Sequence, residues 1–119
     1  MDLEFAQQFA EEWVAGWNSH DLDRIMRHYH DDVVFQSPLA ATLKASDGIV
    51  RGKGALRAYW VQGLRQQPNL RFEVVGVYVG VDTIVINYRN HRAQLVNEVL
   101  TFASDALVVA GWDTYGPTP

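Results

Sequence analysis

The sequence predicts an α+β domain in which helices pack on one face of a curved antiparallel sheet. Apolar residues recur at helical spacing in the first half of the chain, whereas β-branched and aromatic residues crowd four segments of the second half. Short, turn-like connections separate those four segments, so consecutive strands should be antiparallel. The 119 residues fit a single domain, residues 1–119, with a core large enough to fold without a disulfide.

Helices are expected over residues 3–18, 22–29 and 53–67. In the first helix, Trp13 and Trp17 lie close to one face, while Glu11 turns outward. Asp21 is a good N-cap for the second helix, and Pro68 ends the third.

Strands are expected over residues 33–36, 70–80, 82–90, 95–103 and 107–115. The first is short because Ser37-Pro38 stops it. Residues 39–52 are expected to be loop, since they include Gly48 and Gly52 and their polarity is mixed.

The composition excludes several classes of protein. The chain has no cysteine, so it has neither a thiol nucleophile nor a zinc site built on cysteines. A net charge of -4 and scattered Arg and Lys argue against a nucleic-acid partner. Apolar runs are too short for a membrane span, and the acidic N-terminus does not resemble a signal peptide. We therefore expect a cytoplasmic protein with no nucleic-acid or membrane partner.

Neither a metal site nor a cofactor is expected. His28 and His30 are two residues apart, and such positions on a helix point about 200° away from each other. The run Gly52-Lys53-Gly54 lacks the spacing and the Ser or Thr of a phosphate-binding loop.

Alternation along the strand at 95–103 singles out Glu98. Val96, Glu98, Leu100 and Phe102 share one face, and the three apolar members indicate that this face looks inward. Burial of a carboxylate is costly unless it is protonated or paired. Glu98 is therefore either an edge residue that reaches water or pairs with Arg89, or a pocket carboxyl suited to acid–base chemistry.

The neighbours of Glu98 depend on the register of the hairpin. If Asn90 pairs with Leu95, a salt bridge between Glu98 and Arg89 is natural. If a bulge shifts the pairing by one residue, Tyr88 and Asn90 share the face of Glu98 and form a polar pocket with it. The sequence leaves both registers open.

A family resemblance rests on the order and spacing of several runs. They are WNSHDL (17–22), YHDDVVF (29–35), SP (37–38), GKGAL (52–56), YW (59–60), PNLRFE (68–73) and EVLTF (98–102). Together they resemble the nuclear transport factor 2-like superfamily, and within it the SnoaL-like branch of small bacterial proteins. The resemblance implies a cystatin-like cone, in which a strongly bent antiparallel sheet wraps round three N-terminal helices. It also implies a pocket at the open end of the cone and a homodimer formed through the outer face of the sheet.

The superfamily includes isomerases, cyclases, dehydratases and plain binding proteins, so the residues of the site must decide the function. Compared with the ketosteroid isomerase branch, Trp13 stands where that branch has its oxyanion-hole tyrosine. Ser37 stands at the position of the catalytic aspartate, and Glu98 at that of the protonated carboxyl donor. Ser37 cannot carry a proton between carbons, so a ketosteroid isomerase in the strict sense is not expected. Asp113 is a weaker candidate acid–base group and is expected to be an exposed strand residue.

Large aromatic rings on the predicted helices and strands exceed the needs of a compact core, and rings near the mouth of a cone can stack on apolar ligands. The predicted catalytic residues are Glu98 and Tyr88, and the predicted substrate-binding residues are Trp13, Tyr29, Phe35, Trp60, Tyr88 and Asn90. The favoured function is a small-molecule pocket protein of the SnoaL-like type. The sequence leaves open whether it also catalyses an isomerase- or cyclase-like acid–base reaction on a small hydrophobic or aromatic substrate. The alternatives are a non-catalytic ligand-binding domain and a dimeric interaction module of the same fold.

Overall fold

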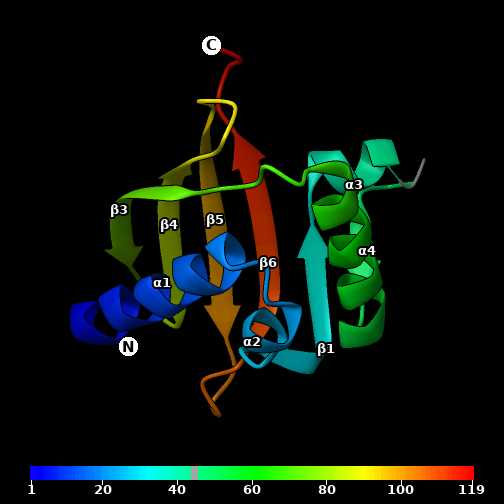
Figure 1. Ribbon diagram of the computed structural model, residues 1–119. Coiled ribbons are helices and arrows are strands. Elements are labelled where there is room, and N and C mark those ends of the chain that lie inside the picture. The colour runs from blue at the N-terminus through cyan, green and yellow to red at the C-terminus, as the bar shows by residue number, and fades with distance from the viewer. Residues whose placement is uncertain (44–45) are drawn as a thin grey trace.

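The computed structural model describes residues 1–43 and 46–119 and shows a curved sheet with helices on its concave face (Figure 1). The helices are α1 (Leu3–Asn18), α2 (Leu22–Met26), α3 (Pro38–Leu43) and α4 (Lys53–Gln66). The strands are β1 (Tyr29–Gln36), β2 (Ile49–Arg51), β3 (Glu73–Val79), β4 (Thr83–Arg89), β5 (Leu95–Phe102) and β6 (Val108–Tyr115). The predicted α+β class is confirmed. Lys44 and Ala45, which belong to the predicted loop 39–52, lie outside the described residues.

The sheet has the strand order β2-β1-β6-β5-β4-β3. The four C-terminal strands form the predicted antiparallel meander, and β1 joins it by pairing in parallel with β6. Helix α1 crosses the face of the meander, and α4 packs beside β1 (Figure 1). Among the described residues, none of the helices combines the length and the apolarity needed to cross a membrane.

Local capping explains where the first two helices begin. The Asp2 carboxylate accepts a hydrogen bond from the backbone N–H of Phe5 at 2.9 Å, and Asp21 accepts one from that of Arg24 at 3.1 Å. The predicted bounds of α1 and the predicted cap of α2 are therefore confirmed. The predicted end of the second helix is wrong, because α2 stops at Met26 and Tyr29 already belongs to β1. The partner strand decides this boundary, since Tyr29 pairs with Val108 of β6.

The prediction of a loop over residues 39–52 is also wrong for most of its described part. Pro38 opens α3, a position that suits its missing N–H, and the Ser37 hydroxyl accepts a hydrogen bond from the N–H of Leu39 at 3.2 Å. Strand β2 then pairs with the end of β1, where Arg51 lies opposite Val34. A three-residue edge strand carries too little periodicity to be seen in the sequence.

The β4–β5 hairpin adopts the second of the two registers left open by the sequence. Arg89 pairs with Leu95, and Ile86 lies opposite Glu98. Tyr88 and Glu98 consequently share the concave face, whereas Arg89 points away from it and is exposed.

Gly111 of β6 leaves room for the ring of Phe35, its pairing partner on β1. A Cβ atom at this position would lie 2.9 Å from Cδ1 of Phe35 and 3.3 Å from Cδ2 of Leu100. We predict that Gly111→Ala lowers the free energy of unfolding by about 1–3 kcal/mol, as overpacking of a filled core does. Urea unfolding followed by circular dichroism measures the change.

The matched control is Gly54→Ala in the first turn of α4, where an added Cβ meets no atom within 4 Å. It should leave stability unchanged or raise it by less than about 1 kcal/mol. Equal effects of the two substitutions would contradict the close packing at Gly111.

Candidate active site

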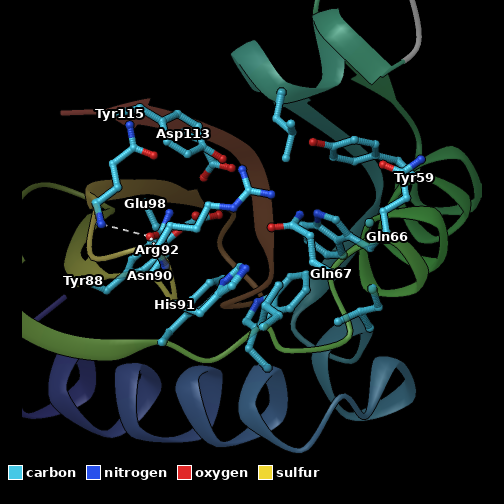
Figure 2. Close-up of a pocket in the computed structure, with 18 of the residues that line it drawn as sticks. Tyr59, Gln66, Gln67, Tyr88, Asn90, His91, Arg92, Glu98, Asp113 and Tyr115 are labelled. Atoms are coloured by element: carbon cyan, nitrogen blue, oxygen red, sulfur yellow. Dashed lines mark hydrogen bonds between the residues drawn. The ribbon is translucent and has the colours of Figure 1, made fainter. Parts of the chain in front are cut away.

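A pocket of about 470 Å³ opens between the concave face of the sheet, α1 and α4 (Figure 2). Of the predicted site residues, those that line it are Trp13, Phe35, Trp60, Tyr88, Asn90 and Glu98. Further lining residues that the sequence analysis did not select include Trp17, Tyr59, Phe72, His91, Arg92, Asp113 and Tyr115. The pocket is therefore larger and more polar at its mouth than the predicted set suggests.

Tyr29 does not line the pocket, so its predicted role in binding is corrected. The side chain is fully buried at the start of β1 and packs against Trp60, with 5.1 Å between the ring centroids. Its hydroxyl has no hydrogen-bond partner among the described residues. Tyr29 instead supports the pocket wall from behind, because its strand position turns it into the core.

Aromatic rings from three elements form the apolar wall. Phe72 contacts Trp13 at 5.6 Å and Tyr88 at 4.4 Å between ring centroids. Trp17 packs edge-to-face on Trp60 at 5.0 Å. Trp17 follows Trp13 by one helical turn and could have been selected on that spacing. Phe72 falls within the strand predicted over residues 70–80, but β3 begins only at Glu73, so Phe72 reaches the pocket from the segment that precedes the strand.

Glu98 lies at the bottom of the polar side of this pocket and is only 4% exposed. The edge position and the Arg89 salt bridge considered for it are both wrong, because β5 lies between β4 and β6 and Arg89 points to the other face. Burial raises the pKa of the Glu98 carboxyl well above its usual value, and the nearby Asp113 carboxylate raises it further. These surroundings favour the protonated form of Glu98 up to a higher pH than for an exposed glutamate.

Asp113 is the partner that the sequence analysis did not expect. It lies directly opposite Glu98 on β6 and lines the pocket, so its predicted exposure is wrong. Its Oδ1 atom is buried and has no hydrogen-bond partner among the described residues. Burial raises the pKa of Asp113 to about 6, against the lowering effect of Glu98 and Ser37. The alternation of Gly111, Asp113 and Tyr115 on one face of β6 was the available signal.

The two carboxyl groups thus divide into an acid and a base. The raised pKa of Glu98 favours its protonated form, which can donate a hydrogen bond, while Asp113, with a pKa of about 6, is mostly ionised at pH 7 and can accept a proton. Such a separation of pKa values within one pocket is typical of catalytic carboxyl pairs.

The phenols near this pair remain neutral. Burial raises the pKa of Tyr59 to about 12, and it raises the pKa of Tyr88 well above the usual value. Tyr88, one of the two predicted catalytic residues, can therefore act as a hydrogen-bond donor but not as a base at neutral pH.

Asn90 lines the pocket, but its side-chain oxygen is used by the hairpin turn. Its Oδ1 atom accepts hydrogen bonds from the backbone N–H groups of Arg92 and Gln94, both at 3.0 Å. Asn90 thus orders the turn at the mouth, and only its amide nitrogen is left for a ligand.

The two histidines near the end of α2, His28 and His30, each contact a different group. His28 lies 3.9 Å from the Glu12 carboxylate, and the His30 ring accepts a hydrogen bond from the N–H of Asp32. The described residues contain no group of three or more potential metal ligands.

The chain belongs to the SnoaL-like family, because the family profile of the SnoaL-like domain matches residues 10–115. A SnoaL-like protein of unknown function from Burkholderia thailandensis is 39% identical in sequence, with a TM-score of 0.93. That alignment covers 98% of this chain and 99% of the other. No curated protein matches the chain.

More distant solved structures share the fold. AclR from Streptomyces galilaeus, a proposed hydroxylase, is 23% identical with a TM-score of 0.75, over 97% of this chain and 91% of its own. A proposed polyketide cyclase from Sinorhizobium meliloti is 12% identical with a TM-score of 0.74, over 90% of this chain and 94% of its own. At these sequence identities the likeness establishes only the shared fold. The activities named for these two proteins are not assigned to this chain.

The raised pKa of Asp113 leads to a prediction about stability. The folded chain binds this proton more tightly than the unfolded chain, so ionisation of Asp113 lowers stability as the pH rises from about 4 to above 6. Asp113→Asn removes this loss. The unfolding free energy of the variant, relative to that of the native chain, should rise by about 3 kcal/mol between pH 4 and pH 8.

Urea unfolding at a series of pH values provides the measurement, and Glu11→Gln, at an exposed carboxylate on α1, is the control. A difference between the Asp113 variant and the native chain that stays constant with pH would contradict a raised pKa at Asp113.

Proposed function

We propose that this protein is an acid–base enzyme of the isomerase or cyclase type that acts on a small hydrophobic or aromatic carbonyl compound. One observation carries the proposal: Glu98 and Asp113 lie opposite each other in an aromatic pocket, and their surroundings separate their pKa values. An acid beside a base in one pocket is what proton transfer at carbon requires.

In the proposed reaction, the Asp113 carboxylate removes a proton from the carbon next to the substrate carbonyl. The protonated Glu98 carboxyl donates a hydrogen bond to the carbonyl oxygen, which gains negative charge as the enolate forms. Asp113 then returns the proton at another carbon, or the enolate carbon attacks a second carbonyl carbon of the same molecule. In that case the carbonyl π bond breaks as the carbon–carbon bond forms, and Asp113 returns its proton to the resulting alkoxide oxygen. The first outcome is an isomerisation and the second is a cyclisation, and both use only these two side chains.

The apolar wall supports the same proposal. Trp13, Phe72 and Tyr88 can hold a flat substrate against the carboxyl pair and exclude water, which strengthens the hydrogen bond from Glu98. In this proposal Asp113 acts as the catalytic base, a role that Ser37 cannot fill. The base then comes from β6 rather than from the end of β1, which is compatible with a different substrate orientation from that of a ketosteroid isomerase.

Deuterium exchange tests the proposed chemistry without knowledge of the natural substrate. The bicyclic aromatic ketone 2-tetralone has acidic C–H groups next to its carbonyl, and NMR in D₂O follows their exchange. We predict that the native protein accelerates the exchange and that its rate rises with pH around a midpoint near 6, as Asp113 ionises. Asp113→Asn should reduce the acceleration at least about a hundredfold, and Glu98→Gln should reduce it less.

The control variant Glu11→Gln should exchange the ketone at the native rate. If 2-tetralone binds but the protein does not accelerate its exchange, the protein is a binding domain and not an acid–base enzyme.

We also propose that two copies associate through the outer face of the sheet. A row of apolar side chains crosses this face from strand to strand, since Tyr78 pairs with Val85, Val85 with Val99, and Val99 with Trp112. Tyr78 is 61% exposed in the single chain, so this row presents apolar surface to solvent. Association would cover it and leave the pocket on the other face free.

Sedimentation velocity at micromolar concentration tests the dimer. The native protein should sediment at twice the 13.5 kDa of one chain, and Trp112→Lys or Tyr78→Lys should shift it to the monomer. Val81→Lys, which changes a 91% exposed residue in the β3–β4 turn, should remain dimeric. A native protein that sediments as a monomer would exclude the interface.

A further inference from the structure

Arg92 lies at the mouth of the pocket and has no part in the proposed chemistry. Arg92 lies in the hairpin turn between β4 and β5, and its guanidinium reaches into the opening of the pocket (Figure 2). Gln67 at the end of α4 lies on the opposite side of this opening. A charged group at this place meets any ligand that enters.

The turn holds Arg92 in place. Asn90 accepts hydrogen bonds from the N–H groups of Arg92 and Gln94, and the N–H of Ala93 bonds to the Asn90 carbonyl at 2.9 Å. The Gln94 amide also donates to the carbonyl of Gly116 at 2.9 Å, which ties the turn to the end of β6. The backbone at Arg92 is therefore ordered before a ligand arrives, which reduces the entropy lost on binding.

The charge of Arg92 has no internal partner. Neither Asp113 nor any other carboxylate in the described part of the chain lies within ion-pair distance of its guanidinium. Burial and the charge of Arg92 lower the pKa of the neighbouring His91, which favours the neutral form of this ring. Arg92 is consequently the single cation among the described residues that line the pocket. The Nδ1 atom of His91 is buried without a partner in the same part of the structure, and it adds a second unused polar atom beside Arg92.

We propose that the ligand of this pocket carries a carboxylate, which Arg92 binds at the mouth while the apolar part of the ligand enters the aromatic interior. The inference rests on the proposed function, since it names the class of substrate for the same pocket. A guanidinium binds a carboxylate through two parallel hydrogen bonds, a geometry that also fixes the direction of the ligand.

The charges inside the pocket support the same orientation. Asp113 is ionised at neutral pH and repels a second negative group, so an acidic ligand cannot enter with its carboxylate first. With the carboxylate held at Arg92, the carbonyl at the other end of the ligand comes to the Glu98–Asp113 pair. The substrate class is therefore a small aromatic keto acid.

A matched pair of probes tests the charge requirement. 2-Naphthoate and 2-naphthamide have the same ring and almost the same shape, but only the first is an anion at pH 7.5. Isothermal titration calorimetry at low salt should show the acid bound at least about tenfold more tightly than the amide, as expected for a charge-assisted hydrogen bond. The preference should fall as sodium chloride is added, because the mouth is exposed to solvent.

Substitutions of Arg92 and Arg89 test which side chain causes the preference for the acid. Arg92→Gln should abolish the preference for the acid while the amide binds as before, and Arg92→Lys should restore part of it. Arg89→Gln is the matched control, since Arg89 is three residues away, exposed, and on the other face of the sheet. This variant loses the same charge and should keep the native preference.

Each outcome decides the proposal. Equal binding of acid and amide by the native protein overturns the carboxylate inference and leaves the pocket and its proposed chemistry intact. Loss of the preference in both arginine variants shows a general effect of net charge and also overturns it. Failure of both probes to bind overturns the inference together with the assignment of this pocket to aromatic ligands.

Discussion

The apposition of Glu98 and Asp113 on neighbouring strands is the constraint on which the rest of the site depends. Two neighbouring carboxyl groups cannot both be ionised at low cost, so both pKa values are raised, that of Glu98 well above its usual value and that of Asp113 to about 6. The register of β5 against β6 creates this pair, and both side chains line the same pocket as the aromatic wall. A polar pair of this kind destabilises the folded chain, and the packing around it must offset that cost.

The curvature and width of the sheet leave a cavity between its concave face and the helices. A smaller or flatter sheet would pack directly against them. Helix α1 brings Trp13 and Trp17 to the concave face, α4 brings Tyr59 and Trp60, and the parallel pairing of β1 with β6 extends the sheet towards α4. The relative that is 39% identical has almost the same backbone, whereas the relatives named for a hydroxylase and a cyclase share the fold at much lower identity. A shared fold of this kind does not determine the chemistry, which depends on the side chains of the pocket.

Much of the fold could be predicted from the sequence, because long amphipathic segments show a clear hydrophobic periodicity. Helix α1, helix α4 and the four strands of the meander follow helical or alternating periodicity and depend little on distant partners. The start of β1 at Tyr29, the short helix α3 and the strand β2 were missed. The start of β1 depends on pairing with β6, far away in the chain, and β2 depends on pairing with β1. Helix α3 packs on the nearby β2 and, with six residues, is too short to show a clear period.

The same division holds for the site. Alternation along β5 was enough to place Glu98 on the inward face, and helical spacing was enough to turn Trp13 and Trp60 towards the pocket. The tertiary structure alone decided which hairpin register forms, that Asp113 rather than Arg89 is the neighbour of Glu98, and that Tyr29 lies behind the pocket wall. The physical reason is that periodicity determines which face a side chain occupies, whereas the partner that it meets depends on the alignment of separate strands.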